Sequence, residues 1–299
     1  MIVLNNRIQT FLETFFTTET EHIQSLLFYG EEGIGKKTVA LSFAQALLCE
    51  QFPSQWGGCG KCDNCLRFAK GLQPDFLFLE PQEGKIAIEN IRQALEFLSY
   101  EPQFSKFKIL IIDQADTLRE EAQNALLKTL EEPPARTLII LISSFPQRLL
   151  STILSRVLLV RFPRLPSEKI TEFLVTQEKI PVAQAQKIAE LAQGKISRAL
   201  ALSQTGTFKK VAETEKQLEL ILGSNFLQRS KYLTQLTKEK DSLKKILKIW
   251  LEKINSDLKD PSTKISPELG KALLKAFDLI SNSNINSTLL LENIFFSYD

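Results

Sequence analysis

The sequence lacks any long apolar run and has almost no excess of charge of either sign. No stretch approaches the roughly 18 consecutive apolar residues that a membrane helix needs, so we expect no transmembrane span. The N-terminal residues have no basic start followed by an apolar run, and a secretory signal is not expected either. The formal net charge is only +2, too small for a strong global attraction to nucleic acid or an anionic membrane. These absences predict a cytoplasmic globular protein without a membrane partner.

Cysteine and histidine are scarce, and the cysteines are confined to one segment. The only histidine is His22, which we expect to be an ordinary surface residue. The four cysteines follow the pattern C-x9-C-x2-C-x2-C and are Cys49, Cys59, Cys62 and Cys65. In a chain without an export signal, such clustering favours metal binding over disulfides. Four thiolates complete the tetrahedral coordination of Zn²⁺ and leave no open position, so we expect a structural zinc site.

Direct contact with nucleic acid is the alternative function for this cysteine segment. Basic side chains lie close to the cysteines, at Lys61, Arg67 and Lys70, and Trp56 is a nearby aromatic residue that could stack on a base. Glu50 and Asp63 offset that charge. Phosphate binding generally needs a denser basic patch, and the zinc interpretation is therefore preferred.

The first half of the chain alternates short apolar runs with stretches of helical periodicity. The apolar runs are Ser25–Tyr29, Phe76–Leu79, Lys108–Ile112, Thr137–Ile142 and Val157–Val160. The helical stretches are Lys36–Cys49, Ile88–Tyr100, Leu118–Glu131 and a short one near Gln147–Leu150. Because the apolar runs show no polar alternation, we expect a mostly parallel sheet that helices cover on both faces.

Strand patterns end after Phe162, and only helical patterns follow. Arg161–Pro166 contains two prolines and is predicted to be a linker, after which Ser167 is expected to cap a helix. We predict an α/β P-loop domain at 1–162 with the cysteine module at 49–65, a small helical lid domain at 163–206, and an all-α C-terminal domain at 207–299.

A glycine-rich loop lies directly between the first predicted strand and the following helix. Residues Gly30–Thr38 read GEEGIGKKT. Glycines at Gly30, Gly33 and Gly35 allow the backbone to curl so that its N–H groups point toward phosphate. The helix N-terminus adds partial positive charge, and Lys36 can neutralise phosphate oxygens. The segment therefore predicts a site for the phosphates of ATP or ADP.

Two positions depart from the pattern of a hydrolytic P-loop. The residue after the loop lysine is normally Ser or Thr, whose hydroxyl binds Mg²⁺, but here it is Lys37, and Thr38 comes one residue late. The strand Lys108–Ile112 runs into Asp113, which stands where a carboxylate supports the metal. Gln114 follows where a general base is expected, and a neutral amide cannot accept a proton from water. We therefore expect no ATP hydrolysis, and we regard Mg²⁺ binding as doubtful.

These motifs, in this order, resemble the clamp-loader family of bacterial DNA polymerase III, and within it most closely the delta-prime subunits. Beyond the loop and the cysteines, the resemblance is carried by Gln73–Asp75 (QPD), Asn124–Pro134 (NALLKTLEEPP), Ser143–Ser144, Thr152–Arg156 (TILSR) and Gly194–Leu200 (GKISRAL). It covers the first 200 residues, and beyond them it rests on helical character alone. The resemblance implies the AAA+ fold: a nucleotide domain, a helical lid, and a helical collar that packs with sister subunits.

The resemblance also implies a function and partners. The partners are other clamp-loader subunits of the gamma/tau and delta types and, through the complex, the sliding clamp and primed DNA. Active gamma or tau subunits have Ser or Thr where this chain has Lys37, and Glu where it has Gln114, so the departures favour a subunit that does not turn over ATP. In Ser155–Val157 (SRV) the family arginine is retained as Arg156, and it is expected to act as an arginine finger on the ATP of a neighbouring subunit.

Two other family roles are assigned less specifically. The polar residue that senses nucleotide after the fourth strand is Ser143 or Ser144. The lid arginine that contacts ATP follows a glycine by three residues; Ser197 occupies that place here, and Arg198 comes next. Whether Arg198 faces nucleotide stays open.

The same motifs leave alternatives for the function of the chain and for the role of Arg156. The chain could be an active gamma-type ATPase if Thr38 served Mg²⁺ and Asp116 oriented water, or a zinc-containing nucleic-acid-binding module. Arg156 could instead form a local ion pair with Glu131 or Glu132.

Overall fold

The computed structural model describes residues 5–17, 25–51, 56–204, 207–237, 240–258, 266–282 and 285–297. His22 lies outside these ranges. The chain divides into two compact units, Met1–Leu200 and Ala201–Asp299. Within the described residues, none of the helices combines the length and hydrophobicity needed to cross a bilayer. The predicted three-part division into domains stays a prediction.

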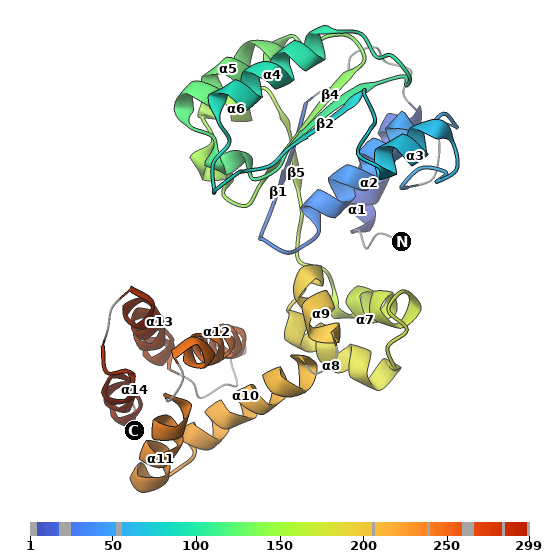
Figure 1. Ribbon diagram of the computed structural model, residues 1–299. Coiled ribbons are helices and arrows are strands. Elements are labelled where there is room, and N and C mark those ends of the chain that lie inside the picture. The colour runs from blue at the N-terminus through green and yellow to red at the C-terminus, as the bar shows by residue number, and fades with distance from the viewer. Residues whose placement is uncertain are drawn as a thin grey trace. The chain divides into compact units, whose positions relative to one another are not determined.

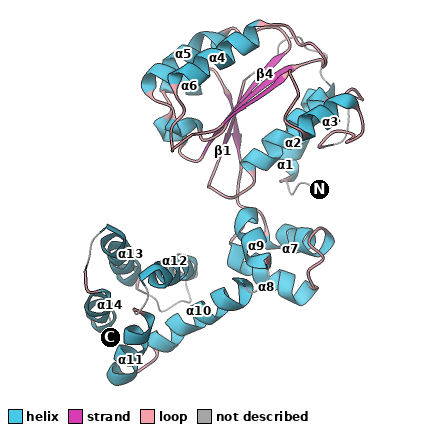
Figure 2. Cartoon of the chain, viewed as in Figure 1, coloured by secondary structure: helices cyan, strands magenta, loops and turns pink. Residues whose placement is uncertain are grey.

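The first unit is built on a parallel sheet, shown in Figures 1 and 2. Its five strands are β1 (Leu26–Tyr29), β2 (Phe76–Leu79), β3 (Lys108–Ile112), β4 (Thr137–Ser143) and β5 (Leu158–Arg161). Their order across the sheet is β2-β3-β4-β1-β5, and each neighbouring pair is parallel. The predicted strands are confirmed to within one residue at each end.

Helices cover both faces of this sheet (Figure 1). One face carries α1 (Asn6–Thr17), α2 (Lys36–Leu48) and α3 (Asp63–Ala69), and the other carries α4 (Ile88–Ser99), α5 (Glu120–Glu131) and α6 (Ser151–Leu154). The long helix predicted to start at Leu118 begins at Glu120, after a short 3₁₀ turn at Ala115–Thr117. The short helix predicted near Gln147–Leu150 is a 3₁₀ turn at Pro146–Arg148 followed by α6.

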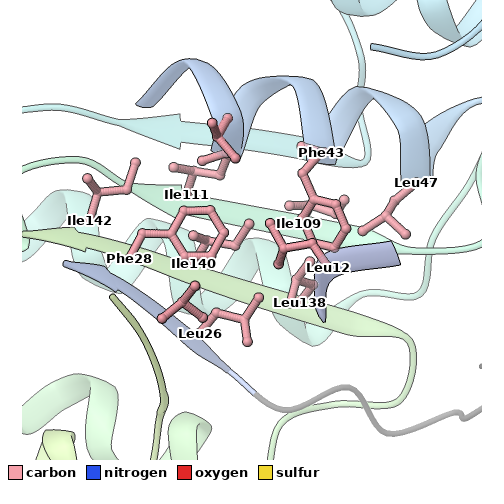
Figure 3. Packing of buried hydrophobic residues seen from close by; sticks show 14 of the residues in the cluster. Leu12, Leu26, Phe28, Phe43, Leu47, Ile109, Ile111, Leu138, Ile140 and Ile142 are labelled. Carbon is pink, nitrogen blue, oxygen red and sulfur yellow. The ribbon is translucent and has the colours of Figure 1, made fainter. Parts of the chain in front are cut away.

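The buried side chains of the strands divide between the two faces because successive residues of a strand point in opposite directions. Ile109 and Ile111 pack with Phe43 of α2 in one hydrophobic cluster, whereas Leu110 and Ile112 belong to the cluster on the opposite face. Figure 3 shows the first cluster, with α2 and α1 placing apolar side chains over the sheet. Since helices cover both faces, the central strands β1, β3 and β4 are buried and read as nearly continuous apolar runs, whereas the edge strands β2 and β5 are partly exposed.

Three helices follow the proline-containing linker, and the first unit ends within the last of them. They are α7 (Ser167–Thr176), α8 (Val182–Ala192) and α9 (Ile196–Ser203). Ser167 does not cap α7 as predicted: Pro166 occupies the N-cap, and Ser167 is the first helical residue. Between α8 and α9, Gly194 has a φ of 80°, and a Cβ there would lie 2.9 Å from the carbonyl oxygen of Leu165. Only glycine fits this turn without strain.

The second unit is entirely helical in its described part. It contains α10 (Thr207–Leu222), α11 (Phe226–Leu236), α12 (Lys240–Asp257), α13 (Pro267–Asn282) and α14 (Ser287–Phe296). Trp250 of α12 is fully buried at the centre of its core. The buried Arg229 of α11 donates hydrogen bonds to backbone carbonyls of Ile221, Leu222, Ser224 and Phe295. Its guanidinium therefore satisfies carbonyl groups that helices leave unpaired at their C-terminal ends.

Candidate functional site

The glycine-rich loop connects β1 to the N-terminus of α2, as the sequence predicted. Gly33 and Gly35 have φ angles of 82° and 97°, which side-chain-bearing residues rarely adopt. Gly35 is the N-cap of α2 and has no side chain to bond the first N–H groups of the helix. Without a capping side chain, the first N–H groups of α2 can donate hydrogen bonds to an anion, as they do at the helix start that follows a P-loop.

Lys36 lies under the loop and is 6% exposed. Its Nζ donates hydrogen bonds to the carbonyl oxygens of Gly30 (2.6 Å) and Glu31 (2.8 Å) and to the hydroxyl of Ser144 (3.1 Å). Burial lowers the pKa of the Lys36 ammonium, and the nearby carboxylates of Asp113 and Asp116 oppose that shift. All three hydrogen-bond acceptors are neutral, so the charge of the ammonium stays available to an anionic ligand.

The loop borders a cavity of about 360 Å³, a size suited to a small organic ligand. The predicted residues that line it are Gly33, Gly35, Lys36, Lys37, Thr38 and Asp113. Gly30 is not among the lining residues; a Cβ there would lie 2.4 Å from the carbonyl oxygen of Phe162, so its role is to let two backbone segments approach closely. The structure therefore brings the predicted loop and Asp113 together around one space.

Lys37 is held by two carboxylates at the edge of this cavity. Leu79 of β2 pairs with Ile112 of β3, so the residues that follow them, Glu80 and Asp113, leave the sheet side by side. The Nζ of Lys37 lies 2.7 Å from Oε2 of Glu80 and 3.5 Å from Oδ2 of Asp113. Burial would lower the pKa of Lys37, but the hydrogen bond to Glu80 and the charge of Asp113 outweigh it, and the pKa is raised. The ammonium is therefore a fixed cation beside Asp113.

The two polar residues after Asp113 do not supply a free base. Gln114 has a φ of 49° and lines the cavity with an amide in place of a carboxylate. The carboxylate of Asp116 accepts hydrogen bonds from the Ser143 hydroxyl (2.6 Å) and from the backbone N–H of Ser144 (3.1 Å). Asp116 thus orders the end of β4, an engagement that competes with orienting a water molecule.

The two candidate sensor serines have different surroundings. Ser143 is buried, and its hydroxyl is occupied by the bond to Asp116 and by the backbone N–H of Phe145. The hydroxyl of Ser144 accepts from Lys36, the lysine of the phosphate loop. Ser144 is therefore the serine whose side chain is linked directly to the loop.

The first residues of α9 and the linker before α7 contact the phosphate loop. The backbone N–H of Ser197 donates to the carbonyl oxygen of Gly33 at 3.0 Å. Glu31 forms two hydrogen bonds of 2.7 Å with Arg164 and an ion pair with Lys195 at 3.3 Å. The hydrogen bonds to Arg164 lower the pKa of Glu31 to about 2, against the opposing effect of burial.

The start of α9 forms one side of the cavity. Ile196, Ser197 and Leu200 line it, and Arg198 is not among its lining residues. The sequence did not indicate a role for Glu31, Arg164 or Glu80. Glu80 could have been noticed because it directly follows a predicted strand, at the sheet edge where the other site residues lie.

Arg156 lies between α6 and β5 with its side chain 30% exposed. Its guanidinium donates to Oε2 of Glu131 at 3.2 and 3.3 Å, and Nη1 donates to the carbonyl oxygen of Thr152 at 3.1 Å. The local ion pair that the sequence analysis considered as an alternative is therefore present in the single chain, with Glu131 as the partner. Because the Glu131 side chain is 59% exposed, water weakens the ion pair and it holds the arginine only weakly.

The four cysteines form one cluster between α2 and α3. Their sulfur atoms all lie within 4.8 Å of one another, with Cys49 to Cys62 at 3.9 Å and Cys59 to Cys65 at 4.0 Å. Tetrahedral coordination with Zn–S bonds of about 2.3 Å requires sulfur atoms about 3.8 Å apart. The four donors therefore fit a tetrahedral metal ion with no open position.

The backbone around the cysteines supports thiolate ligands. The N–H groups of Lys61 and Cys62 donate to the sulfur of Cys59 and lower its pKa to about 6, whereas burial raises the pKa of Cys65 to about 12. A metal ion bound to the four sulfur atoms would favour the ionised form of Cys65. A Cβ on Gly58 would lie 2.7 Å from the sulfur of Cys65, so glycine is required there.

Other side chains attach the cysteine module to the sheet domain. Asn64 is buried and donates to the carbonyl oxygens of Leu48 and Phe104. Trp56 packs against Phe16 and Phe43. It belongs to the core contacts of the module, which disfavours the stacking role considered for it in nucleic-acid binding.

Residues 5–166 match the protein family described as "DNA polymerase III, delta subunit". The chain belongs to this family. It is 40% identical over 138 residues to DNA polymerase III subunit delta' of Pseudomonas aeruginosa, covering 46% of this chain and 42% of the relative. It is 36% identical over 134 residues to subunit delta' of Escherichia coli K12, covering 44% and 40%. The chain thus spans less than half the length of these relatives, and the matches confirm the resemblance to delta-prime subunits of the clamp loader.

Other members of the clamp-loader family are similar too. DNA polymerase III subunit tau/gamma of Haemophilus influenzae is 34% identical over 206 residues, covering 67% of this chain and 29% of the relative. A solved structure of a DNA polymerase III gamma-subunit-related protein from Thermotoga maritima covers 97% of both chains with a TM-score of 0.53 and 22% identity. That likeness and the parallel sheet confirm the coarser part of the predicted fold class, an α/β domain accompanied by many helices. The zinc insert, the lid and the collar stay predictions.

Proposed function

We propose that this chain is a non-hydrolysing subunit of a DNA polymerase III clamp-loader complex, which helps sister subunits place a sliding clamp on primed DNA. The observation that carries the proposal is the contact of the Lys37 ammonium with Asp113. A hydrolytic P-loop has a hydroxyl and a magnesium ion in this region. Here a protein cation neutralises the carboxylate that would support the metal.

The missing general base supports the same conclusion. Gln114 cannot take a proton from water, and Asp116 is engaged by Ser143 and Ser144. An active gamma-type ATPase would need both a metal ion and a general base. Other groups would then have to replace the hydroxyl that is missing at Lys37 and the carboxylate that is missing at Gln114. ATP or ADP can still bind, because the glycine loop, Lys36 and the start of α2 are all present.

We assign the remaining parts of the chain to structure and assembly. Zn²⁺ is the metal that best suits four thiolates with this spacing, and its role is to stabilise the module at 49–65. The division into a nucleotide domain at 1–162, a lid at 163–206 and a collar at 207–299 follows from the clamp-loader resemblance, with the collar joining sister subunits of the gamma/tau and delta types. The complex is expected to work in the cytoplasm.

Arg156 is proposed as the residue that contributes to chemistry, on a site of another subunit. Its planar guanidinium can donate two hydrogen bonds to phosphate oxygens as charge builds during transfer. The ion pair with Glu131 positions the side chain in the free subunit and is weak enough to be exchanged for a phosphate.

Reconstitution tests the proposed function. The purified chain is mixed with gamma/tau-type and delta-type subunits, the product is sized by light scattering, and clamp loading on primed DNA is measured with and without this chain. We expect a stable hetero-oligomer whose loading activity depends on this subunit. Failure to assemble, or loading that is equally fast when the chain is omitted, contradicts the proposal.

A further inference from the structure

The cavity beside the phosphate loop does not fit a magnesium ion. The residue after the loop lysine would supply the metal-binding hydroxyl, and its place is taken by the side chain of Lys37. Besides Glu80 and Asp113, the Lys37 Nζ contacts the ring of Phe78, 4.5 Å from its centroid. A divalent cation near Asp113 would face this ammonium at close range, and the repulsion of like charges opposes its binding.

The same ammonium has the capacity to serve an anion. A lysine ammonium carries three N–H donors, and Glu80 and Asp113 account for two of them. The ring of Phe78 is only a weak acceptor for the third, so an oxygen of a ligand in the cavity that Lys37 lines can compete with the ring for this donor. Lys36 contributes a second positive charge from beneath the loop, where its own acceptors are neutral groups.

We propose that this cavity binds a nucleoside di- or triphosphate in its metal-free form, with the Lys37 ammonium in the place of the magnesium ion. The inference rests on the proposed function, since it assumes that the P-loop still holds nucleotide. It adds a specific ligand state: the free polyphosphate anion is bound, and its magnesium complex is disfavoured. Asp113 then acts as the partner of Lys37 and not as a support for a metal.

Nucleotide titrations with and without magnesium test this inference. Fluorescent mant-ADP and mant-ATP are titrated into the full chain in excess EDTA and in excess Mg²⁺. For the wild type we expect affinity in EDTA that equals or exceeds the affinity in Mg²⁺. For Lys37→Thr, which restores the hydroxyl, we expect Mg²⁺ to strengthen binding about tenfold or more, equivalent to about 1.4 kcal/mol.

Two further variants make the result specific. Lys187→Thr removes an exposed lysine of α8 that does not line the cavity, and it should behave like the wild type. Glu80→Gln keeps Lys37 but removes its closest carboxylate, and it should tighten binding in EDTA because the ammonium is then less neutralised. Thermal melting confirms that each variant is folded before it is titrated.

The outcomes separate this inference from the proposed function. Wild-type affinity that rises tenfold or more with Mg²⁺ overturns the inference, and so does the absence of nucleotide binding in both buffers. Both of these results concern nucleotide binding and neither shows ATP hydrolysis, so neither contradicts the proposed non-hydrolysing role. Conversion of bound mant-ATP to mant-ADP by the isolated chain contradicts the proposed function instead, whatever the effect of magnesium on affinity.

Discussion

The guanidinium of Arg164 forms two hydrogen bonds of 2.7 Å with the carboxylate of Glu31 and so joins the phosphate loop to the linker before α7. The backbone bond from Ser197 to Gly33 is a second link between the same regions. The phosphate loop is therefore held at two points to residues far away in the sequence, and the second link, at Gly33 and Ser197, lies at the cavity itself.

Removing the carboxylate of Glu31 should loosen the attachment of the linker and the start of α9 to the phosphate loop. The side chain of Glu31 is 48% exposed, so the ion pair contributes no more than about 1 kcal/mol. We expect Glu31→Gln to accelerate amide exchange at Ser197 by about fivefold at pH 7, measured by NMR. The matched control is Glu190→Gln, which changes an exposed acid of α8. Equal exchange rates in wild type and Glu31→Gln contradict the role of this pair in holding the linker and the start of α9 against the phosphate loop.

The same pair predicts a pH dependence with a defined sign. The pKa of Glu31 is lowered from 4.5 to about 2 in the folded protein. A carboxylate whose pKa is depressed by folding stabilises the fold at pH values above its pKa in the unfolded chain. This contribution is lost as the pH falls through its pKa in the folded protein. The ratio of exchange rates between Glu31→Gln and wild type should therefore decline from its pH 7 value toward one between about pH 4.5 and 2.

Removal of one cysteine should release the metal. We expect about one zinc ion per purified chain and none in Cys62→Ala, as measured by elemental analysis. Because a closed thiolate site contributes directly to folding, the variant should also lose about 2–3 kcal/mol of stability, or about 5–10 °C in Tm. Lys61→Ala changes a neighbouring exposed residue and should retain the metal. Freshly prepared, reduced wild-type protein without zinc would defeat the assignment.

A pair of substitutions distinguishes catalysis in trans from a local structural role for Arg156. Both Arg156→Ala and Glu131→Ala remove the ion pair between these residues. If the arginine acts on a neighbouring ATP, only Arg156→Ala should lower the clamp- and DNA-stimulated ATPase of a reconstituted complex, while assembly persists. The drop should be smaller than the roughly 10³–10⁵ effect of arginine fingers in GTPases, because other sites keep their partners. Equal rates in both variants contradict the trans role.

The buried Arg229 should be needed for the second unit to fold. Arg229→Met leaves several buried carbonyl oxygens without donors, and we expect a loss of about 3 kcal/mol or more. Fluorescence of the buried Trp250 during urea unfolding reports this unit if Trp56 is first replaced by Phe. Lys231→Met, at an exposed position of the same helix, is the control. A change below about 1 kcal/mol in Arg229→Met would show that the network does not stabilise the unit.

The sheet was predictable because its central strands β1, β3 and β4 are buried on both faces and are nearly continuous apolar runs. The edge strands β2 and β5 are partly exposed, but they carry short apolar runs of the same kind. Two helices, α1 and α3, were not predicted from the sequence. In α1, Phe15 contacts Phe11 of the same helix and also the distant Phe43 of α2, a partner that the local sequence does not reveal. In α3, which is seven residues long, the cap is the sulfur of Cys62, which accepts from the N–H of Cys65 and is not a usual capping group.

The site was predictable where it consists of one continuous segment and harder where the sheet assembles it. Gly30–Thr38 and the cysteines could be found from spacing alone. The contact between Lys37 and Glu80 joins residues 43 positions apart, and it depends on the register that aligns Leu79 with Ile112. Strand register in a parallel sheet is set by packing over the whole domain, so no local pattern indicates this contact.

The most direct test of the central claim is steady-state ATP hydrolysis by the isolated chain, compared with Lys36→Ala. A non-hydrolysing subunit should release phosphate no faster than Lys36→Ala, with or without Mg²⁺, because Lys37 and Gln114 replace the two groups that turnover needs. Magnesium-dependent turnover by the wild type that Lys36→Ala abolishes would contradict the account and identify the chain as an active ATPase.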